Sequence, residues 1–289
     1  MRYRFVQEHA QQFPIALLCR MLEVSPSGYH AWRSRPEAPR RAANRALRRR
    51  LREIHQAHRR CYGRRRLHAQ LQAEGVSCSP NRVARLMQQE GLSGRIRRAF
   101  RVTTDAKHSF PVAPNRLGRD FAASAPDQVW VSDITYLPTE EGWLYLATVM
   151  DLYSRRIVGW AMQASLERSL TVGALEMAIT QRQPGPGLLH HSDRGSQYAC
   201  GDYQQALRQH GMVCSMSRKG DPWDNACAES FFRALKCELV HRAKYETREQ
   251  ARREVFEYIE VFYNRKRLHS SLGYQAPVAF EGKSVLRTA

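Results

Sequence analysis

The chain has 289 residues, 43% of them hydrophobic, which is enough for two or three small domains with ordinary cores. Its net charge of +19 is unevenly spread: residues 1–120 hold 26 Lys and Arg against 8 Asp and Glu, and the rest hold 20 against 19. Charge confined to one end favours a segment that lies on a polyanion, with a solvated basic surface as the alternative. The seven scattered cysteines form no C-x-x-C pair and no apolar stretch has transmembrane length, so we expect a reduced, cytoplasmic protein.

Residues 1–36 are expected to form a small N-terminal helical region. Pro14 and Pro26 each stand where a short helix would begin, and Ser25 is a suitable N-cap for the second helix. The apolar seam of this region is too small for independent stability. Either a helix-turn-helix fragment or a simple packing hairpin would fit the pattern.

Residues 42–98 show three further helical patterns, and a tight turn joins the last two of them. This arrangement is typical of an all-α helix-turn-helix DNA-binding domain. The side chains expected to contact DNA are Arg64, Arg65 and Arg66 on the second helix, Arg82, Arg85 and Gln89 on the third, and Arg97 and Arg98 at its end. Residues 99–124 then read as a basic linker that follows the DNA backbone.

Three residues near this domain, His55, His58 and Cys61, invite comparison with a zinc site. The pattern lacks a C-x-x-C partner, and only Cys78 lies within reach in the sequence. A structural zinc would therefore lack its usual four ligands. We expect these three to be ordinary helix-surface residues.

Residues 125–280 are expected to form an α/β core with a C-terminal helix. The alternation of residue types predicts three antiparallel strands at 129–137, 143–150 and 156–162. Helices and short strands then alternate, as is typical of an α/β or α+β fold with a mixed five-stranded sheet.

Three carboxylates in this core are candidates for a divalent-metal site. Asp133 stands in the middle of a strand-like run, Asp193 ends a short apolar segment, and Glu229 lies 36 positions later, just inside a helix. An unpaired buried carboxylate is costly, so such an Asp usually faces a cleft or a ligand. Asp151 also ends a strand, but the turn that follows predicts a structural role, capping the turn or pairing with Arg155 or Arg156.

The triad Asp133, Asp193 and Glu229 resembles the DDE signature of the retroviral-integrase superfamily, and the chain resembles OrfB transposases of the insertion-sequence-three family. The matching words are Trp130-Val131-Ser132-Asp133-Ile134-Thr135-Tyr136, His191-Ser192-Asp193-Arg194-Gly195, Asp224-Asn225-Ala226 ahead of Glu229-Ser230-Phe231-Phe232, and Tyr263-Asn264 followed by Leu268-His269-Ser270-Ser271-Leu272-Gly273-Tyr274. The resemblance spans essentially the whole chain. It implies a ribonuclease-H-like catalytic core in which the three carboxylates converge at one edge of the sheet.

The resemblance also implies an activity. Three hard oxygen ligands suit two Mg²⁺ or Mn²⁺ ions, which would support DNA strand cleavage and strand transfer at the ends of an insertion sequence. The alternative is a catalytically idle DNA-binding regulator that occupies the element ends.

Asp224 or Asn225 is well placed to cap the helix that bears Glu229.

Further DNA contacts are expected in the C-terminal half. Lys236 and Arg233 share a helix face with Glu229, and in the family a basic residue seven positions after the Glu is thought to contact the element end. The basic and aromatic segment with Asn264, Arg265 and His269 is a second DNA surface or the solvated end of a packing helix. The expected partners are double-stranded DNA, further copies of the chain, and an upstream OrfA product joined by frameshift fusion.

Overall fold

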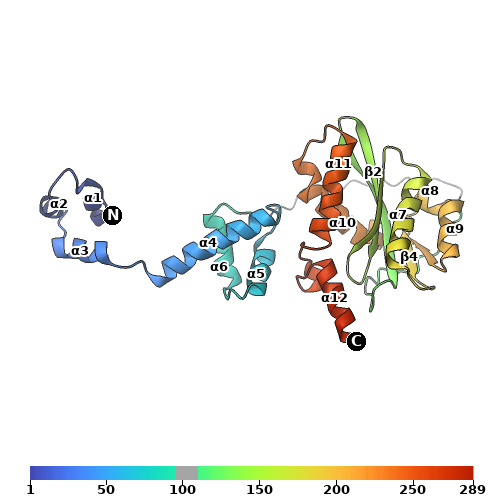
Figure 1. The fold of residues 1–289 in the computed structure, drawn as a ribbon, viewed down its shortest axis with the longest axis horizontal. Helices are drawn as coiled ribbons and strands as arrows, with labels where there is room; N and C mark the ends of the chain where they lie inside the picture. Colours follow the sequence, from blue (N-terminus) through green and yellow to red (C-terminus); the bar gives the residue numbers. More distant parts are fainter. Residues whose placement is uncertain (95–109, 220, 289) are drawn as a thin grey trace. The chain divides into compact units, whose positions relative to one another are not determined.

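The computed structural model describes residues 1–94, 110–219 and 221–288 (Figure 1). The chain divides into two compact units, Met1–Glu53 and Ile54–Ala289. The predicted contacts at Arg97 and Arg98 and the first part of the basic linker, residues 99–109, lie outside the described residues. Among the helices that are described, none has both the length and the apolar character to cross a bilayer.

The first unit is helical. It contains α1 (Arg2–His9), α2 (Ile15–Met21), α3 (Pro26–Ser34) and most of α4 (Pro39–Ala57). Ser25 caps α3 through its hydroxyl, which accepts a hydrogen bond from the Gly28 amide at 3.2 Å, as expected. Helix α1 was not predicted, because its single buried residue, Val6, leaves no periodic apolar stripe in the sequence.

The helical pattern continues into the second unit. Helix α5 (Arg64–Ala73) and helix α6 (Pro80–Gln89) follow α4 as the spacing predicted. Gly75 ends the turn after α5 with a φ of +77°, a backbone conformation that an L side chain rarely adopts. Ser79 caps α6 and Pro80 occupies its first position, so local sequence fixes both ends of this short connection.

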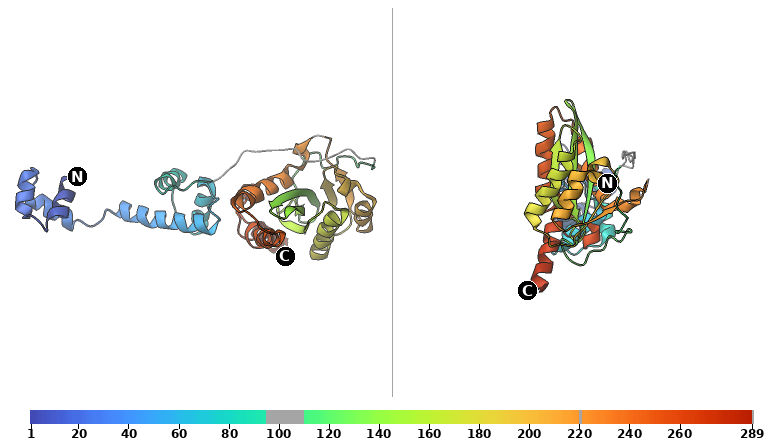
Figure 2. Two further views of the ribbon diagram at one scale, coloured as in Figure 1. Left: turned by 90° about the horizontal axis from the view of Figure 1, so that it is seen from above. Right: turned by 90° about the vertical axis from the view of Figure 1, so that its right-hand side faces the viewer.

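A five-stranded mixed sheet forms the centre of the second unit, in the order β3-β2-β1-β4-β5 (Figures 1 and 2). Its strands are β1 (Val129–Thr139), β2 (Gly142–Asp151), β3 (Ile157–Gln163), β4 (Leu189–Ser192) and β5 (Val213–Met216). The first three pair antiparallel, and β1–β4 and β4–β5 pair parallel. The predicted mixed sheet and the ribonuclease-H-like fold are confirmed.

Helices cover both faces of this sheet. One face carries α7 (Arg168–Arg182), α8 (Ser196–Ala199) and α9 (Gly201–Gln209), which share a core with strand side chains such as Trp130 and Val149. The other carries α10 (Ala226–Glu238) and α11 (Arg248–Phe256) around Val131 and Phe231 (Figure 1). Because successive residues of β1 alternate between these two cores, the register of the central strand is firmly fixed.

The remaining elements complete the C-terminal part. They are the 3₁₀ turns η1 (Pro222–Asn225), η2 (Val240–Arg242) and η4 (Ser270–Leu272), the π-helical segment η3 (Glu257–Tyr263), and α12 (Pro277–Thr288). The Thr247 hydroxyl accepts from the Gln250 amide at 3.1 Å and starts α11, as its capping-box-like pattern predicted. The sequence predicted one long helix in this region. In the structure α11 ends at Phe256, and the wider π-helical turns of η3 continue it without a break.

Candidate active site

The ends of two adjacent strands bring the two aspartates together. Strands β1 and β4 run parallel, and Val131 is the register partner of His191. Continuing that register by two residues places Asp133 opposite Asp193, just beyond the end of β4. Each carboxylate is held by a neighbouring backbone amide: Asp133 accepts from Ile134 at 2.8 Å, and Asp193 accepts from Gly195 at 2.9 Å.

The third carboxylate, Glu229, lies in the first turn of α10. This helix packs on β1, and one side chain ties its start to that strand: the Asn225 amide group donates to the Ser132 carbonyl at 3.0 Å. Ser132 is the residue before Asp133, so the hydrogen bond fixes the start of α10 directly beside the first aspartate. Asn225 occupies the N-cap position of α10, one of the two positions predicted for the cap, but its side chain makes no capping hydrogen bond to the helix.

The site gathers several negatively charged carboxylates in a partly buried position. Burial, and then the negative charge of Asp193, raise the pKa of Asp133 well above its usual range, and Glu229 adds to the effect. Burial also raises the pKa of Glu229. Lys236 stands nearby with its Nζ 5.0 Å from the centre of the Tyr136 ring, and burial lowers its pKa although Asp133 opposes the shift.

The donor set fits hard divalent cations such as Mg²⁺, which prefer carboxylate oxygens. The raised pKa of Asp133 indicates an excess of negative charge that a bound cation would relieve. Within the described ranges, however, no three His, Cys, Asp or Glu side chains converge closely enough to hold one ion among them. The chemistry of the donor set therefore fits a divalent cation, with water or phosphate completing its coordination.

A buried ionic network beside the site was missed by sequence reasoning. Asp224 has no exposed surface and accepts hydrogen bonds from the side chains of Arg218, Arg119 and Asn115. The hydrogen bonds from Arg218, despite burial, hold the pKa of Asp224 far below its usual range. Asn115 and Asp224 are 109 positions apart, so no local pattern announces this pair. The network fixes the segment that leads into α10.

Asp151 occupies the structural position that its turn suggested. It is fully buried, and its carboxylate accepts from the amides of Asp127 at 3.0 Å and Ser154 at 2.8 Å and from the Ser154 hydroxyl at 2.8 Å. These bonds link the start of β1 to the turn after β2. Within the described residues the Asp151 carboxylate does not form the expected alternative pair with Arg155 or Arg156, because backbone amides already bind both of its oxygens.

Replacing Asp151 by Asn should lower stability and spare chemistry. The side-chain NH₂ group of Asn is a donor, and it would face at least one of the N–H or O–H donors that now bind the carboxylate. Leaving such a buried donor without an acceptor costs about 1–3 kcal/mol in unfolding free energy. Urea denaturation should show this loss, while the cleavage rate per folded molecule stays within about threefold of wild type, roughly 0.6 kcal/mol. A well-folded but inactive Asp151→Asn protein would instead place Asp151 in the catalytic site.

The predicted DNA contacts divide into two groups. The side chains of Arg64, Arg65, Arg85, Gln89, Arg233 and Arg265 are exposed, and Arg82 is half-buried. On α6, Arg85 and Gln89 lie one turn apart on the solvent side, opposite the buried Val83 and Leu86. The exposed side chains of this group are accessible to DNA, and the contact of the whole group with DNA stays a prediction.

The second group is engaged within the protein. Asn264 is 2% exposed, and its amide group bonds both the amide and the carbonyl of Ile157 at 3.0 Å, which contradicts the predicted DNA contact. Arg66 donates from Nε to the Leu268 carbonyl at 2.9 Å. His269 packs edge-on against Tyr263, and burial lowers its pKa to about 2, so it is neutral at physiological pH and cannot serve as a cationic phosphate contact. Tyr263, Asn264 and Arg267 are therefore buried within this segment while Arg265 stays exposed, a difference that composition alone did not show.

The zinc candidates are likewise engaged in local contacts. His55 Nε2 pairs with the Ser93 carbonyl at 3.2 Å, and His58 Nδ1 pairs with the Ile54 carbonyl at 2.8 Å. Cys61 donates from its thiol to the Arg59 carbonyl. All three residues were expected on the helix surface, but His55 is 7% exposed and Cys61 4% exposed, so for these two the expectation is wrong.

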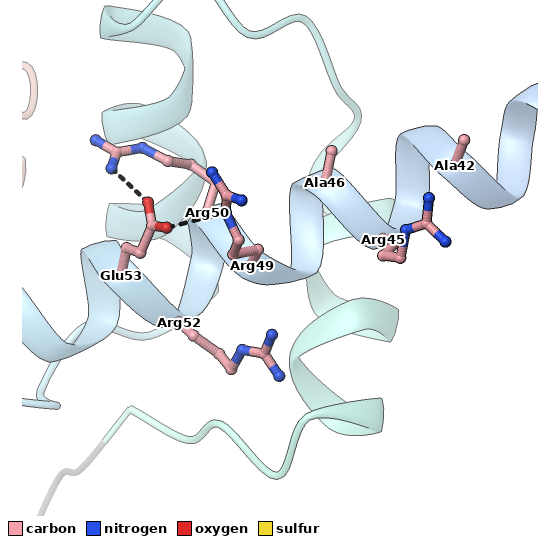
Figure 3. Close-up of a pocket in the computed structure, with 7 residues that line it drawn as sticks. All are labelled: Ala42, Arg45, Ala46, Arg49, Arg50, Arg52 and Glu53. Atoms are coloured by element: carbon pink, nitrogen blue, oxygen red, sulfur yellow. Dashed lines mark hydrogen bonds and ion pairs between the residues drawn. The ribbon is translucent and has the colours of Figure 1, made fainter.

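Helix α4 carries a basic hollow of about 420 Å³ (Figure 3). Its lining residues are Ala42, Arg45, Ala46, Arg49, Arg50, Arg52 and Glu53. Glu53 pairs with Arg49 at 3.2 Å and with Arg50 at 2.9 Å, and Arg45 pairs with Glu37 at 2.9 Å, so arginines outnumber the carboxylates along this helix surface. The small alanines leave room between the arginines, so this helix surface suits the phosphates of a polyanion.

Comparison with known proteins agrees with this architecture. Residues 123–222 and residues 229–285 each match a family described as Integrase core domain, and residues 42–100 match the HTH-like domain. Among solved structures, the simian T-cell lymphotropic virus intasome in complex with PP2A regulatory subunit B56 gamma is 15% identical with a TM-score of 0.48, covering 79% of this chain and 73% of that one.

Curated relatives are much more similar. "Transposase InsF for insertion sequence IS3A" of Escherichia coli (strain K12) is 40% identical over 289 residues, covering 99% of this chain and all of the relative. "Insertion element IS600 uncharacterized 31 kDa protein" of Shigella sonnei is 44% identical over 266 residues, covering 92% of this chain and 98% of the relative. The chain therefore belongs to the insertion-sequence-three family of transposases, whose integrase core makes it an enzyme of polynucleotidyl transfer.

Proposed function

We propose that Asp133, Asp193 and Glu229 carry out metal-dependent DNA cleavage and strand transfer at the ends of an insertion sequence. The observation that supports this most is the placement of Asp133 and Asp193 at neighbouring ends of parallel strands, with Asn225 holding the start of the Glu229 helix beside them. An idle regulator of element ends would gain nothing from this costly gathering of like charges. The enzyme is therefore the better reading.

The carboxylates divide between two cation positions in this proposal. Asp133 and Asp193 would hold one Mg²⁺ or Mn²⁺ ion, and Asp133 and Glu229 would hold the second. When bound, such cations relieve the negative charge of the phosphodiester and of the attacking and leaving oxygens. Burial and the charge of Asp193 raise the pKa of Asp133, so protons compete with cations for this carboxylate, and the cation affinity should fall as the pH is lowered.

Two successive displacements at phosphorus account for transposition. In the first, water attacks the phosphorus at the element end, the bond to the 3′ oxygen breaks, and that oxygen leaves as a hydroxyl. In the second, the freed 3′-hydroxyl attacks a phosphodiester of another strand and displaces its 3′ oxygen. Both steps are phosphoryl transfers that require positioning and charge stabilisation, so no covalent intermediate with the protein is needed.

The metal requirement can be tested with the full chain. A plasmid that carries the coding sequence and its flanking DNA should be nicked at the flanks in the presence of Mg²⁺ or Mn²⁺, and EDTA should abolish the nicking. Titration calorimetry should detect cation binding to wild-type protein and a loss of about tenfold or more in affinity for Asp133→Asn, about 1.4 kcal/mol. Cleavage that survives EDTA would refute the proposal.

DNA is expected to contact two regions. Around the site, we propose that Lys236 and Arg233 bind the phosphates of the element end, since Lys236 lies within electrostatic reach of Asp133 and Arg233 is exposed on the same helix. In the helical region, we propose that α4 and the exposed face of α6 with Arg85 and Gln89 hold the duplex. Arg64, Arg65, Arg82 and Arg265 would add phosphate contacts.

The basic hollow on α4 should appear in the salt dependence of DNA binding. Each neutralised phosphate releases a counterion, so Arg45→Gln combined with Arg49→Gln should lower the slope of log affinity against log salt by about 2, with similar losses on all sequences. Arg168→Gln on α7, which removes an arginine that is also exposed and pairs with Asp202 at 3.2 Å, is the matched control. An unchanged slope would remove α4 from the DNA surface.

The working assembly is also proposed rather than seen. We infer that several copies act together on DNA, because two element ends must be processed in one event. We further propose that an upstream OrfA product, joined by frameshift fusion, supplies additional recognition of the ends, and that the enzyme acts on the chromosomal DNA of its cell. Sequencing of the flanking DNA for an overlapping upstream frame tests the fusion directly.

A further inference from the structure

Trp223 is the most exposed of the five tryptophans, with 70% of its surface accessible. It lies in η1, the 3₁₀ turn that precedes α10. Among the described residues, no aromatic ring or cation packs on its indole. A large apolar ring of this kind normally packs in a core or an interface, so its exposure on an ordered turn requires an explanation.

The backbone that carries Trp223 is firmly held. Its amide donates to Asp221 Oδ1 at 3.2 Å, and the next residue is the fully buried Asp224. Asp224 accepts hydrogen bonds from the Arg218 amide at 2.8 Å, Arg119 Nε at 2.9 Å and Asn115 Nδ2 at 2.9 Å. Several hydrogen bonds fix the backbone on either side of Trp223. The exposure of the ring therefore follows from the conformation of an ordered turn.

The same turn is tied to the catalytic carboxylates. Asn225, two positions after Trp223, donates to the carbonyl of Ser132, the residue before Asp133. Glu229 follows six positions after Trp223, in the first turn of the helix that η1 introduces. The position of the indole is therefore set by the same contacts that set the positions of Asp133 and Glu229.

Cationic side chains surround this turn. The Asp224 network joins residues 115–119 to residues 218–219 and 221–224. Arg119 and Arg218 pair there with Asp221 and Asp224, and Arg116 and Lys219 add two further positive charges. Arg116, Arg218 and Lys219 are exposed. An aromatic ring among cations, next to a phosphodiester-cleaving site, has the chemistry of a single-strand nucleic-acid contact, because the cations attract the backbone and the ring stacks on a base.

We propose that Trp223 is a stacking platform for an unpaired nucleobase of the DNA strand next to the scissile phosphate. The proposal rests on the function proposed above and adds a ligand to it: a base that has left its duplex partner at the element end. Stacking on the indole would hold the frayed strand in place while Asp133, Asp193 and Glu229 act on the neighbouring phosphate. The interaction needs no particular base, because every base offers a π-face.

Fluorescence of 2-aminopurine tests this with the full-length protein. The probes are a duplex with a forked end that carries one unpaired 2-aminopurine, and a blunt duplex of the same sequence. Wild-type protein should quench the forked probe and bind it more tightly than the blunt one. Trp223→Leu should reduce the affinity for the forked end by about 5- to 100-fold and remove the quenching, with less than about twofold effect on the blunt duplex.

Two further variants sharpen the result. Trp223→Phe keeps a stacking ring and should retain most of the affinity for the forked end. Phe256→Leu alters another exposed aromatic ring, on α11 beside Trp160, and should change neither probe. Equal losses on forked and blunt DNA, or no loss at all, would overturn the proposal. Because binding is measured without cleavage, this outcome is distinguishable from an inactive wild-type enzyme, which would overturn the proposed function instead.

Discussion

Replacing Asp133 by Asn is expected to abolish strand cleavage and strand transfer while leaving duplex binding nearly unchanged. The substitution keeps the size of the side chain and removes the charge that cation binding needs. Losing one such ligand removes several kcal/mol of charge stabilisation in the transition state, about a thousandfold or more in rate. Asp193→Asn and Glu229→Gln should have the same effect, because each takes one charge from a shared site.

The stability of the metal-free protein gives this prediction an internal control. Burial and the charge of Asp193 raise the pKa of Asp133 in the folded protein, so ionising Asp133 costs folding free energy. This cost is absent below the usual Asp pKa of 3.8 and develops as the pH rises through the higher folded value. Asp133→Asn removes the cost, so its melting temperature without metal should equal or exceed that of wild type, with the difference growing from acid to neutral pH.

The combination of these two results identifies the role of the residue. An inactive and less stable Asp133→Asn protein would point to misfolding and not to a lost ligand. Asp151→Asn should show the opposite pattern, with lowered stability and preserved chemistry, because its carboxylate is saturated by Asp127 and Ser154. An active Asp133→Asn protein would refute the assignment of this carboxylate.

The parts of the fold that sequence predicted are those whose signal is local. Alternation marked β1 and β2, and Ser79-Pro80 marked the start of α6, because a capping hydroxyl and a fixed proline φ act over three or four residues. The carboxylates were found through short words around Asp133 and Asp193. The parallel pairing of β1 with β4 brings these two sequence motifs together into one site, because it places the two aspartates opposite each other.

The parts that sequence reasoning missed depend on distant partners. Asn264 looked like a DNA contact because it stands among Arg and Lys, yet its amide group braces Ile157, 107 positions earlier. Arg66 looked like its exposed neighbours Arg64 and Arg65, yet it bonds the Leu268 carbonyl. Composition does not distinguish a buried polar group with a partner from an exposed one with a ligand, because both require the same side chain.

Removing the carboxylate of Glu238 should have the largest effect on stability outside the core apolar residues. Glu238 and Arg267 are both almost fully buried. They form a bidentate ion pair, in which Arg267 Nη2 lies 2.7 Å from Glu238 Oε1 and Arg267 Nε lies 2.8 Å from Glu238 Oε2. Tyr258 donates its hydroxyl to the same carboxylate at 2.9 Å, and Arg66 lies 3.9 Å from it. Glu238→Ala would leave the Arg267 guanidinium buried without its counter-charge, which costs about 3–5 kcal/mol.

The pH dependence of this contribution has a defined sign. Burial alone would raise the pKa of Glu238, but the charge and hydrogen bonds of Arg267 outweigh it and lower the pKa below its usual value of 4.5. A carboxylate with a lowered folded pKa stabilises the protein above its usual pKa, and the contribution is lost as the pH falls through the folded value. The difference in unfolding free energy between wild type and Glu238→Gln should therefore be constant near neutral pH and shrink below pH 4.5.

A double substitution separates the pair from the space it fills. Glu238→Leu with Arg267→Met replaces two buried charges by apolar side chains of similar volume, and such replacements are often neutral or stabilising. The double variant should thus recover most of the stability lost in Glu238→Ala. Glu238 also lies two positions after Lys236 on α10, the helix that carries Glu229 in its first turn, so a displaced C-terminal end of α10 should reduce cleavage in the single variant and not in the double one. If the double variant were as unstable as Glu238→Ala, the loss would come from packing around Tyr258 and not from a stranded arginine.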